Sequence, residues 1–67
     1  MKKMKIKEFW MALGRADRNK LLFEVSQICQ ISIQTVQAWM LKYRTPKGLN
    51  KDALSKYIRE NYNTEII

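Results

Sequence analysis

Apolar residues recur along the chain at a spacing close to the α-helical period, in four separate segments. The first segment carries a stripe at positions i, i+3, i+4 and i+7, which defines one face of a helix: Ile6, Phe9, Trp10 and Leu13. Gly14 follows directly and is expected to end this helix.

The second segment follows a polar connection over residues 14–19, in which Asp17 or Asn19 is placed to cap a helix. Its apolar residues again have helical spacing: Leu21, Leu22, Val25, Ile28 and Cys29. We therefore expect a second amphipathic helix that ends near Gln30.

The third segment begins at Ser32, whose hydroxyl can accept a hydrogen bond from the amide of Gln34 or Thr35 as an N-cap. Ile31 before this cap and Val36 after it have the spacing of a hydrophobic staple. A helix over about 32–43 is predicted, with the following residues on its buried face: Val36, Trp39, Met40 and Tyr43.

Pro46 and Gly48 interrupt the helical pattern and separate a fourth segment from the third. Asn50 is the expected cap of a fourth helix, and Leu49 and Leu54 are spaced as a second staple. The apolar face of this helix is predicted to consist of Leu54, Tyr57 and Ile58.

No internal repeat, low-complexity run or alternating strand pattern accompanies the four helical segments. We therefore predict an all-α fold: one compact four-helix domain over residues 1–67, with residues 1–4 as a flexible basic arm and residues 62–67 as a flexible tail. A domain of this length buries only about 60% of its unfolded surface, so its core depends on large apolar side chains.

The net charge of +7, from 13 Lys and Arg against 6 Asp and Glu, is large for so short a chain. Such a field favours phosphate polymers or anionic surfaces as partners, although a surplus of charge can also serve solubility alone. No run of about 20 apolar residues is present to span a membrane. We expect a soluble, cytoplasmic protein without a membrane partner.

Several kinds of chemistry are excluded by composition. The single cysteine, Cys29, cannot form an intramolecular disulfide, and its apolar setting is typical of a buried structural thiol. The absence of histidine excludes a Cys/His zinc site and histidine acid–base catalysis. We expect no cofactor, no small-molecule substrate and no enzymatic activity.

The run ISIQTVQAW, residues 31–39, followed by Arg44 and Pro46, carries a family resemblance. It resembles the Cro/phage-repressor (lambda repressor-like) helix-turn-helix family, in which a Ser or Thr, a Thr-Val pair, a Trp and an Arg-x-Pro occur at this spacing. The resemblance covers about residues 21–47. It implies that the second and third helices form a helix-turn-helix, the unit that places its second helix in the major groove.

Four positions depart from the usual family residues. Gln30 stands where the turn usually holds Gly because it needs positive φ, at a cost of about 1 kcal/mol if that geometry is kept. Lys42 replaces a common helix-ending Gly, so that either the loop before Pro46 differs or the third helix runs a turn longer. Met40 follows the Trp where the family often has Glu. Ser26 replaces a small Ala at the helix crossing.

The resemblance implies that Ile33, Gln34 and Ala38 read bases, with Gln37 reaching a base or a phosphate. Gln can bond adenine bidentately, and Ala and Ile can contact a thymine methyl. The predicted backbone contacts are hydroxyls near the helix start and cations after it: Ser32, Thr35, Lys42, Arg44, Lys47 and Lys51. Between Val25 and Lys51 there is no Asp or Glu. The N-terminal lysines could follow a phosphate strand or the minor groove: Lys2, Lys3, Lys5 and Lys7.

These observations favour a double-stranded DNA-binding transcriptional regulator, such as a repressor, encoded by a phage or mobile element in bacteria. By the family resemblance it would bind as a homodimer, with candidate contacts at Tyr57, Tyr62, Ile66 and Ile67. The alternative is a small protein-interaction module, an antitoxin or phage factor that uses the same fold to bind an acidic partner. RNA binding is less favoured because no array of stacking aromatics is evident.

Overall fold

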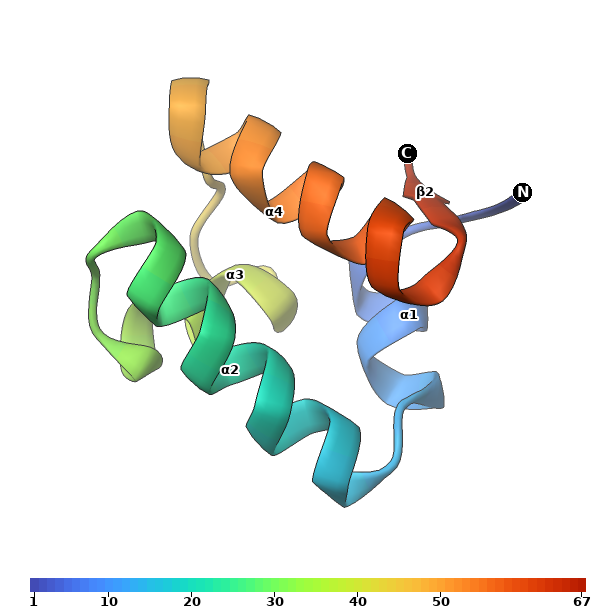
Figure 1. Ribbon diagram of the computed structural model, residues 1–67, viewed down its shortest axis with the longest axis horizontal. Helices are drawn as coiled ribbons and strands as arrows, with labels where there is room; N and C mark the ends of the chain where they lie inside the picture. The colour runs from blue at the N-terminus through green and yellow to red at the C-terminus, as the bar shows by residue number, and fades with distance from the viewer.

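The structure is a computed structural model that describes residues 1–67. Its elements are, in chain order, β1 (Lys2–Met4), α1 (Ile6–Ala12), α2 (Arg15–Cys29), α3 (Ile33–Met40), α4 (Gly48–Tyr62) and β2 (Thr64–Ile66). The four helices confirm the predicted all-α class, to which the structure adds one small sheet. Figure 1 shows the two long helices, α2 and α4, running in opposite directions, with α1 near the chain termini.

The core is a single cluster of 11 buried apolar residues contributed by all four helices. It consists of Ile6, Phe9, Trp10, Leu21, Val25, Val36, Trp39, Met40, Leu54, Tyr57 and Ile58. All of these belong to the apolar faces that the helical spacing predicts. Each helix therefore contributes one stripe, and burial of these large side chains supplies the main stabilisation of the domain.

Three apolar residues differ from their expected burial. Tyr43 is 80% exposed, Ile28 is 57% exposed and Leu49 is 85% exposed. The predicted staple between Leu49 and Leu54 is therefore wrong. For Tyr43 the reason is local, because α3 ends at Met40 and the helical spacing no longer applies beyond it.

The starts of α2 and α4 also differ from prediction. Gly14 is the N-cap of α2 and Lys47 is the N-cap of α4, both in extended conformation and neither with a side-chain cap bond. The predicted caps lie inside the helices instead: Asp17 in the first turn of α2, the alternative Asn19 further along α2, and Asn50 in the first turn of α4. A carboxylate in the first turn still stabilises a helix through its dipole, so Asp17 favours the α2 start without capping it.

Arg18 fixes the corner between α1 and α2. Its Nε donates to the carbonyl oxygen of Trp10 at 3.1 Å and its Nη2 to that of Met11 at 3.3 Å. The guanidinium carbon also lies 5.2 Å from the centroid of the Trp10 ring, within the range of a cation–π interaction. One side chain thus provides a hydrogen bond to the Met11 carbonyl and a second one to the Trp10 carbonyl, which also accepts from the amide of Leu13. Both carbonyls lie at the C-terminal end of α1, where a helix leaves its last carbonyls without regular helical partners.

The two chain ends pair with each other. β1 and β2 form a parallel sheet in which Lys2, Lys3 and Met4 lie opposite Thr64, Glu65 and Ile66. This corrects the expectation of an unpaired arm over residues 1–4 and a frayed tail over residues 62–67. The physical reason is Asn63, whose left-handed conformation (φ 50°) ends α4 and returns the chain beside the N-terminus.

Cys29 is a free, half-buried cysteine near the end of α2. Burial raises the pKa of its thiol above the ordinary value, which keeps it protonated at neutral pH. None of the helices has the length and apolar character that a membrane crossing requires.

Candidate nucleic-acid interface

The connection between α2 and α3 consists of residues 30–32. Gln30 adopts the left-handed conformation (φ 56°), so the positive φ expected at this position is present without glycine. The amides of Gln30 and Ile31 both donate to the carbonyl oxygen of Ser26, which closes the end of α2. Ser26 is 6% exposed, and its hydroxyl donates to the Phe23 carbonyl at 2.7 Å. The predicted crossing of α2 and α3 therefore accommodates a serine, because the serine hydroxyl has a hydrogen-bond partner in its own helix.

The start of α3 has the predicted cap. The amide of Thr35 donates to Oγ of Ser32 at 3.2 Å, and the two hydroxyl oxygens lie 2.9 Å apart. Ile31 packs against the core, in keeping with its predicted place before the cap. The first turn of α3 is thus held in place, while the side chains of Ile33 and Gln34 on this turn remain exposed.

The two sides of α3 differ sharply in exposure. Val36, Trp39 and Met40 are buried, with exposed fractions of 0%, 4% and 0%. Gln34 and Gln37 are exposed and Ile33 is 43% exposed, whereas Ala38 is only half-exposed. The side that is predicted to read bases is therefore accessible to solvent, and it carries no charge.

The chain turns sharply after α3. Lys42 has a φ of 67°, which takes the conformation of the helix-ending glycine that it replaces. The amides of Tyr43 and Arg44 both donate to the carbonyl oxygen of Ala38, at 2.9 and 3.2 Å. This tight turn excludes the longer third helix that was one of two expectations, and it corrects the predicted end at residue 43.

The turn exposes an aromatic side chain that the sequence pattern assigns to the core. Tyr43 projects from the protein next to Arg44, beyond the end of α3. Its hydroxyl could donate to a phosphate, and its position follows the exposed side of α3 in the chain. The sequence signal for the exposure of Tyr43 is Lys42. Lys42 stands at the position of a common helix-ending glycine, and the helical spacing of apolar residues does not extend beyond such a position.

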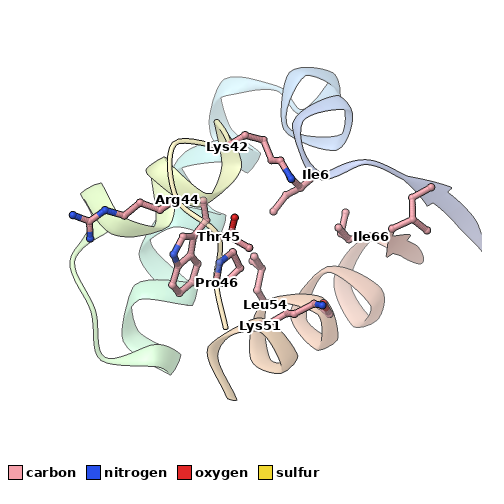
Figure 2. A pocket seen from close by; sticks show the side chains of 11 residues that line it. Ile6, Lys42, Arg44, Thr45, Pro46, Lys51, Leu54 and Ile66 are labelled. Carbon is pink, nitrogen blue, oxygen red and sulfur yellow. The ribbon is translucent and has the colours of Figure 1, made fainter. Parts of the chain in front are cut away.

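The predicted backbone-contacting cations are all exposed, but they do not form one cluster. Lys42, Arg44 and Lys51 line a common hollow, whereas Lys47 lies outside it as the N-cap of α4. Figure 2 shows the ammonium group of Lys42 directed toward Ile6 and the guanidinium group of Arg44 extending away from the hollow. The structure thus brings three of the four cations to one hollow, but the side chain of Arg44 is directed away from it.

The N-terminal lysines are divided between two settings. Lys2 and Lys3 belong to β1 and are paired with β2 through its backbone, so they do not form a free arm. Lys5 and Lys7 lie near Lys42, around a second hollow next to the first. Cations from the N-terminal segment and from the turn after α3 therefore combine into one positively charged region.

The predicted dimer contacts are mostly unavailable in this fold. Tyr57 is 7% exposed and belongs to the core, while Tyr62 and Ile66 are half-buried against it. Ile67 is 71% exposed and is the one member of the set with a free side chain.

No protein-family model matches the chain, and comparison with curated proteins and with solved structures gives no match either.

Proposed function

We propose that this protein is a sequence-specific double-stranded DNA-binding protein of the transcriptional regulator type. In this proposal α2 and α3 form a helix-turn-helix, and α3 enters the major groove. The observation that carries the proposal is the exposed, uncharged side of α3, whose opposite side is anchored in the core by Val36, Trp39 and Met40. A recognition helix requires this combination, because its outer side chains must reach base edges from a rigid support.

The side chains on this face suit direct readout of adenine and thymine. The amides of Gln34 and Gln37 can each donate to N7 and accept from N6 of adenine, and Ile33 can contact a thymine methyl. Ala38 is half-exposed, so it contributes a small apolar surface that lets the helix approach the bases closely. We propose A·T-containing half-sites for this reason.

Charge supports the same assignment. No Asp or Glu occurs between Val25 and Lys51, so nothing on α3 or its flanking connections would repel a phosphate backbone. Arg44, Lys47 and the hydroxyl of Tyr43 are exposed beyond α3, where groups that hold the duplex are needed. Release of counterions by such contacts supplies most of the affinity in protein–DNA binding.

The proposal is tested by selection from random duplex DNA, followed by titration of the selected and a scrambled duplex at two salt concentrations. With about four to six phosphate contacts per monomer, log affinity should fall against log salt with a slope near −0.9 per contact. The selected duplex should bind at least about 10³-fold more tightly than the scrambled one. Binding without salt dependence, or without any preferred sequence, would contradict the proposal. Binding to an acidic protein in place of DNA would favour the alternative of a protein-interaction module.

A further inference from the structure

A hollow of about 360 Å³ lies between α1, α4, β2 and the chain that links α3 to α4. Its apolar part is formed by Ile6, Trp39, Pro46, Leu54 and Ile66, which come from five separate parts of the chain. Figure 2 shows Leu54, Ile6 and Ile66 directed toward this space from different sides. The volume lies within the range of small-molecule sites, which begins at about 300 Å³.

The polar lining of the hollow is positive. Lys42, Arg44 and Lys51 contribute three cations, and Thr45 and Ser55 contribute hydroxyls, with no Asp or Glu among the lining residues. An apolar floor with a cationic rim is complementary to a molecule that has an apolar body and an anionic end.

The adjacent second hollow extends this positive region. It shares Ile6, Lys42 and Ile67 with the first and adds Lys5 and Lys7. An anion held near Lys42 would therefore be surrounded by lysines from three parts of the chain: the N-terminal segment, the turn that follows α3, and the helix α4. Because several cations act together, the electrostatic potential at this position is more favourable for an anion than the potential near an isolated surface lysine.

We propose that the hollow binds a small organic anion, a carboxylate with a short apolar body. The body lies on Leu54, Ile6 and the ring of Trp39, and the carboxylate lies near the ammonium groups of Lys42 and Lys51. Arg44 is a weaker candidate for the anion because its guanidinium group extends away from the hollow (Figure 2). The proposal does not rest on DNA binding, since it requires neither α3 nor the connection before it to meet a duplex. The site does use Lys42 and Lys51, which are also predicted contacts for the phosphate backbone.

The test uses three probes that separate charge from apolar body: hexanoate, acetate and 1-hexanol. Titration of the ¹⁵N-labelled protein by NMR should show hexanoate binding at least about tenfold more tightly than either control, since both parts of the site contribute. The indole N–H of Trp39, which lines the hollow, should shift, while that of Trp10, which does not, should stay constant. Shifts spread over the surface, or equal affinities for hexanoate and acetate, would overturn the proposal.

Two lysine variants and a matched control locate the anion. Lys42→Gln and Lys51→Gln should each weaken hexanoate binding about two- to fivefold, as expected for loss of one exposed ion pair. Lys56→Gln removes the same charge from an exposed position on α4 outside the hollow, and it should leave the affinity nearly unchanged. Equal effects of Lys51→Gln and Lys56→Gln would show that net charge alone attracts the probe, and would overturn the assignment.

A filling variant tests the apolar part of the site. Ser55 is half-buried and lines the hollow, so Ser55→Leu should occupy the space and lower hexanoate affinity at least about tenfold, which removes the advantage of the apolar body. A thermal melt of the variant shows whether the fold is kept, and Ser55→Ala provides the control that leaves the space open. Undiminished hexanoate binding by a folded Ser55→Leu protein would place the probe elsewhere and overturn the proposal.

Discussion

The hydroxyl of Tyr57 on α4 donates a hydrogen bond to the carboxylate of Glu24 on α2, 33 positions earlier in the chain. This bond ties together the two long helices. Tyr57 is also 6.4 Å from Tyr62, ring centroid to ring centroid, and Tyr62 in turn packs edge-on against Phe9 at 5.3 Å. The contact between α2 and α4 therefore joins a polar link to an aromatic cluster.

This link predicts a loss of stability in alkaline solution. Burial, followed by the hydrogen bond to Glu24 and its negative charge, raises the pKa of Tyr57 well above its ordinary value near 10. The folded state thus holds a proton that the unfolded state releases, so stability is complete below about pH 10 and falls as the pH rises beyond that. Burial also raises the pKa of Tyr62, with Asp17 and Glu24 adding to the effect.

Urea unfolding of the wild type and of Tyr57→Phe between pH 8 and 11 checks this prediction. Lysine titration affects both proteins alike, so the difference between them isolates Tyr57. The variant should be less stable at pH 8, by about 1–3 kcal/mol for the partner left unpaired, and its stability should decline less steeply above pH 10. Parallel curves for the two proteins would contradict the assigned cause.

Trp39→Ala should destabilise the domain by about 3–5 kcal/mol, because it removes a large side chain that is 4% exposed at the centre of the core. A domain this small has a total stability near the low end of about 5–15 kcal/mol, so the variant should be largely unfolded. Circular dichroism during thermal melting provides the measurement. Trp39→Phe, which keeps an aromatic ring, should lose less stability than Trp39→Ala. An unchanged melting temperature would show that the helix does not pack as described.

Gln30→Gly should stabilise the protein by up to about 1 kcal/mol. A residue with a Cβ atom is strained in the left-handed conformation that Gln30 adopts, and glycine removes this strain at some entropic cost in the unfolded chain. Asn63→Gly is the matched control, since Asn63 has a similar φ of 50° but asparagine already tolerates it. Denaturant midpoints should therefore rise for Gln30→Gly and change less for Asn63→Gly.

Gln34→Ala and Lys47→Ala should separate base reading from backbone attraction. Gln34→Ala should cost about 1–3 kcal/mol on the preferred duplex and much less on a scrambled duplex. Lys47→Ala should weaken both duplexes by similar factors and reduce the salt slope by about one. Gln27→Ala, at an exposed position on α2, serves as the control and should leave both affinities unchanged. Equal losses on both duplexes for Gln34→Ala would exclude its side chain from base recognition.

The features that the sequence predicts are those that local spacing determines. The apolar faces around Val36 and Leu54 and the cap at Ser32 depend on residues at most four positions apart. The spacing does not determine the end of α3, because Lys42, a residue with a Cβ atom, takes a conformation that glycine usually fills. The prediction that Tyr43 belongs to the core is wrong for the same reason.

The remaining features depend on contacts between distant residues. β1 and β2 contain three residues each, which is too short for an alternating pattern to be recognised. Their pairing follows from the return of the chain after Asn63, which the sequence does not reveal. The hollow is hidden for a similar reason, because Ile6, Lys42 and Ile66 come together only when the helices are assembled.

The parallel pairing of β1 with β2 has a consequence for the order in which the molecule folds and opens. It closes almost the entire chain into a loop, and the entropic cost of closure rises with loop length. The helices must pack first to bring the ends together, so the strand pairing forms late and should be among the first contacts to open. Amide protons in this pairing, such as that of Ile67, which donates to Met4 at 3.0 Å, should exchange with solvent sooner than those of α2. Since Ile66 and Ile67 also form a wall of the hollow, each such opening would widen its entrance.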